Sequence, residues 1–128
     1  MTYLLDVNAL VALGVAHHAA HARVSHWVHS LRGIQLATCP ITEIGFVRVT
    51  CGAAGLTADA TIARQLLVQL KAAAGLTLLA DANGADSLPG WVKRAAQVTD
   101  GHLLALAAKH GAKLATLDTG IRGAFLIP

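Results

Sequence analysis

The sequence predicts an α/β fold in which helices cover both faces of a mainly parallel sheet. Short apolar segments typical of buried strands alternate along the chain with longer segments of helical periodicity. Acidic residues stand at several of the junctions between these segments, where parallel sheets gather functional side chains at their carboxyl edge. The chain has 128 residues, of which 55% are hydrophobic, and we expect one domain over 1–128.

Each predicted strand is short, apolar and bounded by turn or capping residues. The first begins with the β-favouring Thr2 and Tyr3 and ends at Asp6, and the fourth ends at Asp118. The turn pairs Asn83-Gly84 and Pro89-Gly90 mark 82–91 as a loop, with or without a short helix. The predicted strands are 2–5, 34–38, 76–79, 113–117 and 124–127.

Each predicted helix has apolar residues three and four positions apart, and most have a start or stop signal. Asn8 and Thr99 are the predicted N-caps of the first and last helices, and Pro40 suits the first turn of the third. Glycines follow four of the helices: Gly33, Gly52, Gly75 and Gly111. The predicted helices are 9–16, 18–31, 40–51, 59–73 and 100–110.

The distribution of charge suggests a partner. The net charge is +3, and only 13% of the residues are charged. Four of the seven acidic residues lie at or just after segment junctions: Asp6, Glu43, Asp100 and Asp118. Without them, the chain carries ten basic and three acidic residues, a net charge of +7. A basic body with a few acids set apart favours a polyanion such as nucleic acid.

The positions of these four acids also suggest a chemistry. Asp6 and Asp118 end strands, while Glu43 and Asp100 are expected in the first turns of helices that open onto the same crevice. Converging carboxylates repel one another, and a divalent cation bound through oxygen relieves that repulsion. Mg²⁺ or Mn²⁺ held in this way would act on a phosphodiester. Ordinary turn and first-turn roles explain each acid equally well, so the residues alone leave both readings open.

Four segments resemble the motifs of PIN-domain nucleases, in order and in spacing, over nearly the whole chain. They are Leu4–Leu10, Ile41–Val49, Val98–Ala107 and Gly111–Asp118. The subtype that they resemble is the VapC-type toxin of bacterial toxin–antitoxin pairs.

This resemblance implies a three-layer α/β/α sandwich with a mainly parallel sheet of four to five strands. It implies an Mg²⁺- or Mn²⁺-dependent endoribonuclease that hydrolyses RNA phosphodiester bonds with metal-activated water. It also implies an antitoxin partner and a homodimer. Asp6, Asp100 and Asp118 would hold the metal, and Glu43 would bind metal or position the water. The residues that match the family's accessory polar positions are Asn8 and Thr116.

Four further residues are predicted to contact RNA: Lys93, Arg94, Arg48 and Trp91. Lys93 and Arg94 precede Asp100 in a loop and suit an RNA backbone, although a solvated charge pair explains them as well. Trp91 suits base stacking, whereas Trp27 is expected in the core or at a dimer contact. Five histidines lie within 17–29 on the outer face of a predicted helix, with no acid or cysteine to complete a metal site.

An alternative function is a non-catalytic RNA- or protein-binding module on the same fold. A phosphoryl-accepting receiver domain fits poorly, because Asp6 stands alone where a receiver needs paired acids. No apolar run reaches the roughly 18 residues of a membrane helix, and the start lacks the basic segment of a signal peptide. Cys39 and Cys51 make no disulfide framework, so we expect a cytoplasmic protein with two buried thiols.

Overall fold

The structure is a computed structural model that describes residues 1–52 and 59–128. Five strands form one sheet in the order β3-β2-β1-β4-β5, and every neighbouring pair is parallel. The strands are β1 (Thr2–Leu5), β2 (Gln35–Thr38), β3 (Thr77–Leu78), β4 (Lys113–Thr116) and β5 (Phe125–Leu126). The predicted parallel sheet is therefore confirmed, with five strands.

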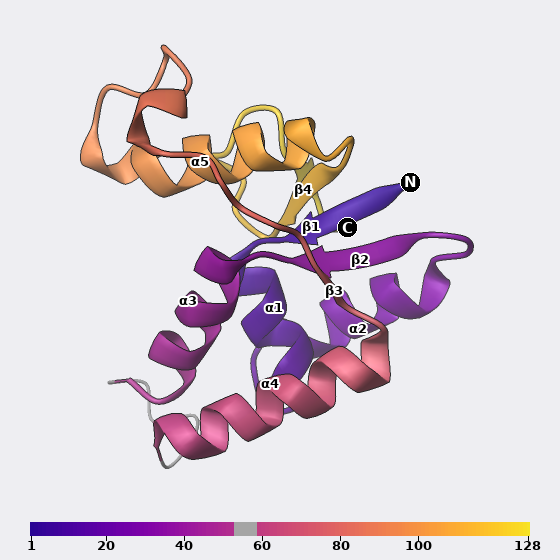
Figure 1. Cartoon of the computed structure of the whole chain (residues 1–128). Helices are drawn as coiled ribbons and strands as arrows, with labels where there is room; N and C mark the ends of the chain where they lie inside the picture. Colours follow the sequence, from indigo (N-terminus) through magenta and orange to yellow (C-terminus); the bar gives the residue numbers. More distant parts are fainter. Residues whose placement is uncertain (53–58) are drawn as a thin grey trace.

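Helices cover both faces of this sheet (Figure 1). One face carries α5, and the other carries α1, α2, α3 and α4. Their bounds are α1 (Val7–Gly14), α2 (His21–Ser30), α3 (Pro40–Thr50), α4 (Ala60–Ala74) and α5 (Ala95–Lys109). The loop after β3 contains the short 3₁₀ helix η1 (Ala85–Ser87). This is the predicted three-layer α/β/α sandwich.

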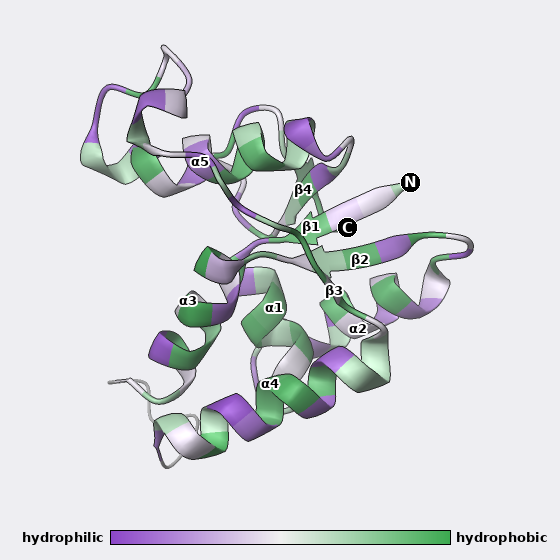
Figure 2. Cartoon of the chain, viewed as in Figure 1, coloured by the Kyte–Doolittle hydropathy of each residue, from purple (hydrophilic) through white to green (hydrophobic). Residues whose placement is uncertain are grey.

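Alternate residues along the central strands face different helices, as the period of two in a strand requires. Leu5 belongs to the core cluster that contains Leu10 of α1, whereas Leu4 and Leu114 pack with Leu103 of α5. Figure 2 shows α1 as mainly apolar, in keeping with its position against α2, α3 and α4. Among the described residues, no helix combines the length and hydrophobicity that a membrane span requires.

The start of α1 differs from the prediction. Asp6, not Asn8, is the N-cap: its Oδ1 accepts a hydrogen bond from the Val7 backbone N–H at 2.8 Å. Both residue types are good caps, and Asp6 is the first to follow the strand, so the helix begins two residues earlier than predicted. Asn8 thus lies within the helix, and its amide is free to bond elsewhere.

The start of α5 also differs. The N-cap is Arg94 rather than Thr99, and Asp100 lies in the second turn of the helix instead of the first. Gln97 Oε1 accepts hydrogen bonds from the backbone N–H groups of Lys93 and Arg94, at 2.9 and 3.1 Å. A glutamine that reaches back in this way from the third helical position is a known start signal, which the sequence analysis overlooked.

Smaller differences concern α2 and the thiols. α2 begins at His21 rather than at residue 18, and the predicted stop at Gly33 lies in the turn beyond its end. Gly75 and Gly111 end their helices with φ near 67° and 66°, the left-handed conformation that glycine favours. Cys39 is buried, but Cys51 is only partly buried.

Two of the helices, α1 and α3, approach each other closely at Gly45. A Cβ atom at this buried position of α3 would lie 2.7 Å from Val7 Cγ2 of α1. Real Cβ contacts are longer, so a side chain here would force the second turn of α3 away from the start of α1.

We therefore expect Gly45→Ala to lower the free energy of unfolding by about 1–3 kcal/mol, the usual cost of overpacking. Urea unfolding followed by circular dichroism measures this loss. Gly90→Ala is the matched control, because a Cβ there meets no atom within 4 Å. Equal unfolding midpoints for the two variants would contradict the close approach.

Candidate active site

The predicted acidic residues lie around the carboxyl edge of the sheet. The register pairs Leu5 of β1 with Ala115 of β4, so Asp6 and Thr116 follow side by side. The Asp6 backbone N–H donates to the Ala115 carbonyl at 2.9 Å, which extends the pairing to the edge. On the other side of β1, β2 ends at Thr38. Three neighbouring strands therefore end together where the acids gather.

Asp6 is buried, with 8% of its surface exposed, and both of its carboxylate oxygens are bonded. Oδ1 accepts from the Val7 N–H, and Oδ2 accepts from the Thr116 hydroxyl at 2.8 Å. Thr116 Oγ1 in turn accepts from the Asp118 backbone N–H at 3.0 Å. The hydroxyl thus connects the strand-end acids of β1 and β4 and orients the Asp6 carboxylate.

Asn8 and Asp118 complete the polar turn after β4. Asn8 Oδ1 accepts from the Leu117 N–H at 3.3 Å, so α1 is bonded to the segment that carries Asp118. Asp118 Oδ1 accepts from the Gly120 N–H at 2.7 Å, and the Asp118 side chain is exposed. The bond from Gly120 uses one oxygen of the Asp118 carboxylate, and the other has no hydrogen-bond donor among the described residues.

Asp100 approaches the same edge from α5. Partial burial raises the pKa of its carboxyl group above the ordinary value of 3.8, and the negative charges of Asp6 and Asp118 raise it further. Within the described residues, no hydrogen bond to this carboxylate offsets the repulsion. The charges of Asp6, Asp100 and Asp118 therefore interact at this edge, although the three residues come from separate parts of the chain.

Glu43 has bonded partners of its own. Its Oε2 accepts from the Thr38 hydroxyl at 2.5 Å and forms an ion pair with Lys71 Nζ of α4 at 2.8 Å. The two charged side chains are 20% and 27% exposed, so this pair is shielded from solvent far more than a surface salt bridge. Lys71 of the neighbouring helix α4 therefore neutralises the charge of Glu43, the fourth acid.

The chemistry of the donor set fits a hard divalent cation. Among the described residues, no three His, Cys, Asp or Glu side chains form a ready metal-binding group. Mg²⁺ does not require one, because it takes one or two carboxylates and completes its shell with water and substrate phosphate. A cation between Asp6, Asp100 and Asp118 would offset the negative charges that, together with burial, raise the Asp100 pKa.

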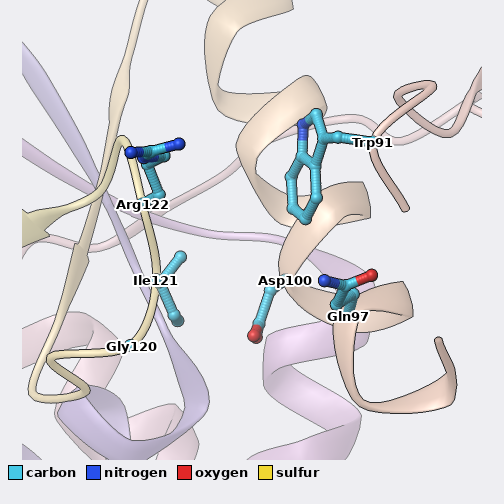
Figure 3. A pocket seen from close by; sticks show the side chains of 6 residues that line it. All are labelled: Trp91, Gln97, Asp100, Gly120, Ile121 and Arg122. Atoms are coloured by element: carbon cyan, nitrogen blue, oxygen red, sulfur yellow. The ribbon is translucent and has the colours of Figure 1, made fainter. Parts of the chain in front are cut away.

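The predicted RNA-contact residues are not gathered in one place. Trp91 lines a cavity of about 490 Å³ together with Asp100 (Figure 3). Arg48 lines another cavity of about 290 Å³, which also includes Thr99. Lys93 and Arg94 are exposed at the start of α5. Trp91 thus shares a cavity with a site acid, whereas the cavity that Arg48 lines includes none among the described residues.

Sequence reasoning missed three residues at this edge: Thr38, Lys71 and Arg122. Thr38 carried a usable signal, since it ends a predicted strand immediately before the helix of Glu43. Arg122 follows Asp118 in the loop and lines the cavity of Asp100. No periodicity or motif connects Lys71 with Glu43, because their contact is set by the packing of α4 on α3.

Other residues that the sequence singled out have structural partners. Trp27 is 5% exposed, and its ring contacts Tyr3 with a centroid distance of 5.2 Å, so it belongs to the core. His102 pairs with Asp81 at 2.6 Å, which ties the loop after β3 to α5. The histidines of 17–29 enter no metal-binding group in the described part of the chain.

This fold and this acidic edge define a domain of the PIN class. The family model described as the PIN domain matches residues 3–124, so the chain belongs to that family.

Within the family, the chain is similar to the ribonucleases named VapC. It is 44% identical over 122 residues to Ribonuclease VapC38 of Mycobacterium tuberculosis, covering 92% of this chain and 86% of that protein. It is 37% identical over 127 residues to Ribonuclease VapC39 of the same organism, covering 94% and 91%. The crystal structure of M. tuberculosis VapC20, titled a sarcin-ricin loop cleaving toxin, matches with TM-score 0.65 and 14% identity over 98% of this chain and 99% of that one.

The repulsion at Asp100 predicts a pH-dependent stability. Because the pKa of the Asp100 carboxyl group is raised in the folded state, ionising this group costs more in the folded than in the unfolded protein. Its effect on the free energy of unfolding is therefore most favourable at a pH below 3.8 and is lost as the pH rises through the raised pKa. We therefore expect Asp100→Asn to increase the melting temperature of the metal-free protein at pH 7. The increase should shrink as the pH approaches 4, which thermal unfolding across pH 4–8 in EDTA measures.

Asp86→Asn is the matched control for this change, since Asp86 is exposed in η1 away from the three aspartates. It should leave the melting temperature within experimental error of the parent at every pH. A stabilisation by Asp100→Asn that does not vary with pH would contradict the electrostatic origin.

Proposed function

We propose that this chain is the endoribonuclease toxin of a toxin–antitoxin pair, with 1–128 acting as a single PIN domain. One observation carries the proposal: partial burial and the negative charges of Asp6, after β1, and Asp118, after β4, raise the pKa of Asp100 in α5. The names of the VapC relatives support ribonuclease activity, and the net basic charge suits an RNA substrate.

In this proposal Asp6, Asp100 and Asp118 hold Mg²⁺ or Mn²⁺. The bound cation supplies Lewis-acid stabilisation of phosphate charge and lowers the pKa of water. The chain's own residues set the geometry: the Val7 N–H and the Thr116 hydroxyl fix both oxygens of Asp6. Asn8 and Thr116 are positioning residues, because they act through Asp6 and the Asp118 turn.

Glu43 has a separate role in the proposal, either as a further cation ligand or as the group that orients the attacking water. Its carboxylate already accepts a hydrogen bond from Thr38, which fixes one oxygen and leaves the other as an acceptor. Arg48, Lys93 and Arg94 are exposed and would contact the RNA backbone, which places the substrate without reading its sequence.

A protein partner has a surface to bind on α3 and α4. Both helices expose large apolar side chains, namely Ile41, Ile44, Val49, Ile62 and Val68. An antitoxin segment, or a second copy of the chain in a homodimer, would bury them. A basic antitoxin side chain that reached the acidic edge would offset the carboxylates as a cation does.

The first test of this function is cleavage of purified total RNA by the protein with Mg²⁺, with Mn²⁺ and with EDTA. We expect discrete products with either metal, none with EDTA, and loss of about 100-fold or more in rate for Asp100→Asn. This variant is cleaner than Asp6→Asn, because within the described residues Asp100 accepts no hydrogen bond that asparagine would disturb. Gel electrophoresis of end-labelled RNA gives the rates.

Asp86→Asn should cleave at the parent rate and serves as the control for loss of one carboxylate. Circular dichroism confirms that each variant is folded. RNA that is bound but never cleaved under any metal would favour the binding-module alternative and overturn the nuclease.

A second prediction concerns the ion pair at the fourth acid. Lys71 Nζ forms an ion pair with Glu43 Oε2 at 2.8 Å, so it would compete with a metal cation for this carboxylate. We expect Lys71→Met to lower the Mg²⁺ concentration for half-maximal cleavage by roughly 3- to 10-fold, as for removal of a nearby like charge. Cleavage rates over a magnesium titration measure the change.

Lys71→Arg keeps the positive charge and should keep the parent magnesium dependence. Lys109→Met removes a lysine that is bonded to Asn83 instead, and is the control for loss of a surface charge. An unchanged or higher magnesium requirement in Lys71→Met would show that Lys71 supports Glu43 rather than competing for it.

A further inference from the structure

We propose that the cavity beside Asp100 is a nucleotide subsite, in which an RNA base stacks on Trp91, is read by the Gln97 amide and has its phosphate bound by Arg122. This inference rests on the proposed ribonuclease function and specifies how the site selects its substrate. The cavity of about 490 Å³ lies within the usual range of ligand pockets, roughly 300–1,000 Å³. Its remaining lining residues are Asp100, Gly120 and Ile121.

Trp91 presents an aromatic surface at a fixed place. Its side chain is 49% exposed, although an unpartnered indole costs free energy in water. The loop that carries it packs directly on α5: a Cβ atom at Gly101 would lie 2.3 Å from Val92 and 3.6 Å from the Trp91 ring. Gly101 follows Asp100 in the chain, so the Trp91 ring packs against the residue next to this acid.

Gln97 offers a hydrogen-bond donor whose orientation is known. Its Oε1 accepts from the Lys93 and Arg94 N–H groups, which fixes the amide and directs Nε2 away from the backbone. Figure 3 shows the amide nitrogen on the side of Asp100 and the oxygen on the far side. Nε2 has no acceptor among the described residues. Guanine O6 and uracil O4 would supply one, whereas adenine and cytosine carry a donating amine at the equivalent place on the base edge.

Arg122 provides the positive charge opposite Asp100. The residue is exposed and lines the cavity, and within 1–52 and 59–128 its guanidinium has no carboxylate partner. A free guanidinium suits a phosphate, which it binds through two parallel hydrogen bonds. Figure 3 shows Arg122 and Trp91 on the two walls of the cavity, with the Asp100 carboxylate between the loop and α5.

These three groups together match a nucleotide better than a peptide segment. The flat aromatic surface can stack on the face of a base, and the fixed amide donor can bond to the edge of that base. The free guanidinium can bind a phosphate. Asp100 at the same cavity would place the adjoining phosphodiester at the proposed cation site. The subsite therefore determines which nucleotide lies next to the cleaved bond.

Binding is tested first on the wild-type protein in EDTA, where no cleavage occurs. Trp91 is exposed and Trp27 is buried, so nucleotide stacking should quench the fluorescence of Trp91 alone. We expect GMP and UMP to quench at lower concentrations than AMP and CMP, and Trp91→Phe to abolish the quenching. The absence of quenching by all four nucleotides would overturn the subsite.

Variants then test each contact by fluorescence anisotropy of labelled RNA oligonucleotides. Trp91→Ala should weaken binding by roughly 5- to 100-fold, the range for loss of one stacked base. Gln97→Glu keeps the oxygen that accepts from Lys93 and Arg94 but replaces the donor with an acceptor. It should reverse the preference for guanine and uracil over adenine and cytosine.

Arg122→Gln should weaken binding and reduce its salt dependence, whereas Arg64→Gln, an exposed arginine in another cavity, should change neither. If Trp91→Ala fails to fold, Gln97→Glu decides the question. Parent affinity and parent base preference in Trp91→Ala and Gln97→Glu would overturn the subsite while cleavage continues. Nucleotide quenching without any RNA cleavage would instead leave the subsite and overturn the nuclease function.

Discussion

Mutual repulsion among carboxylates is the constraint on which the architecture of this edge depends. The fold must hold Asp6, Asp100 and Asp118 together although their charges oppose it, and burial of Asp6 at 8% exposure raises the cost. The parallel register meets this demand, because it sets Asp6 beside Thr116 and makes a hydroxyl donor available. The N-terminus of α1 supplies a second donor at the other oxygen. Sheet pairing and helix capping thus each supply one hydrogen-bond donor to the Asp6 carboxylate.

The two layers of helices contribute to this edge in different ways. The α5 layer brings one acid that has no bonded partner within the described chain, and so it carries the unrelieved charge. The opposite layer brings Glu43 together with its counter-charge, because α4 packs on α3 and places Lys71 against the carboxylate. The acid on the α3 side, Glu43, therefore has a counter-charge without a cation, whereas the acid on the α5 side, Asp100, has none among the described residues. That difference is the physical basis for distinguishing Glu43 from the three aspartates.

Much of this arrangement could be predicted from the sequence, and the failures have identifiable causes. Apolar runs located all five strands, and Gly75 and Gly111 located the ends of α4 and α5, because burial and left-handed backbone leave local signals. Helix starts were less certain: Asp6 and Asn8 compete as caps, and the glutamine cap at Gln97 outweighed Thr99. Lys71 and Arg122 could not be found, since tertiary packing alone brings them to the acids. The prediction that Asp100 lies in the first turn of its helix was wrong, but its charge still interacts with those of Asp6 and Asp118 from the second turn.

The contact between Gly101 and the loop of Pro89–Val92 has a consequence for how such a protein can change. The loop rests on bare backbone beside Asp100, so the proposed cation ligand and the proposed base-stacking surface adjoin at a position that has no side chain of its own. Substitutions within 89–92 can alter the surface offered to a ligand while the acid stays in place. A substitution at Gly101 displaces both at once. Under the proposed function, substitutions in the loop can therefore change which ligand is selected, whereas Gly101 must stay a glycine for the loop to pack on α5.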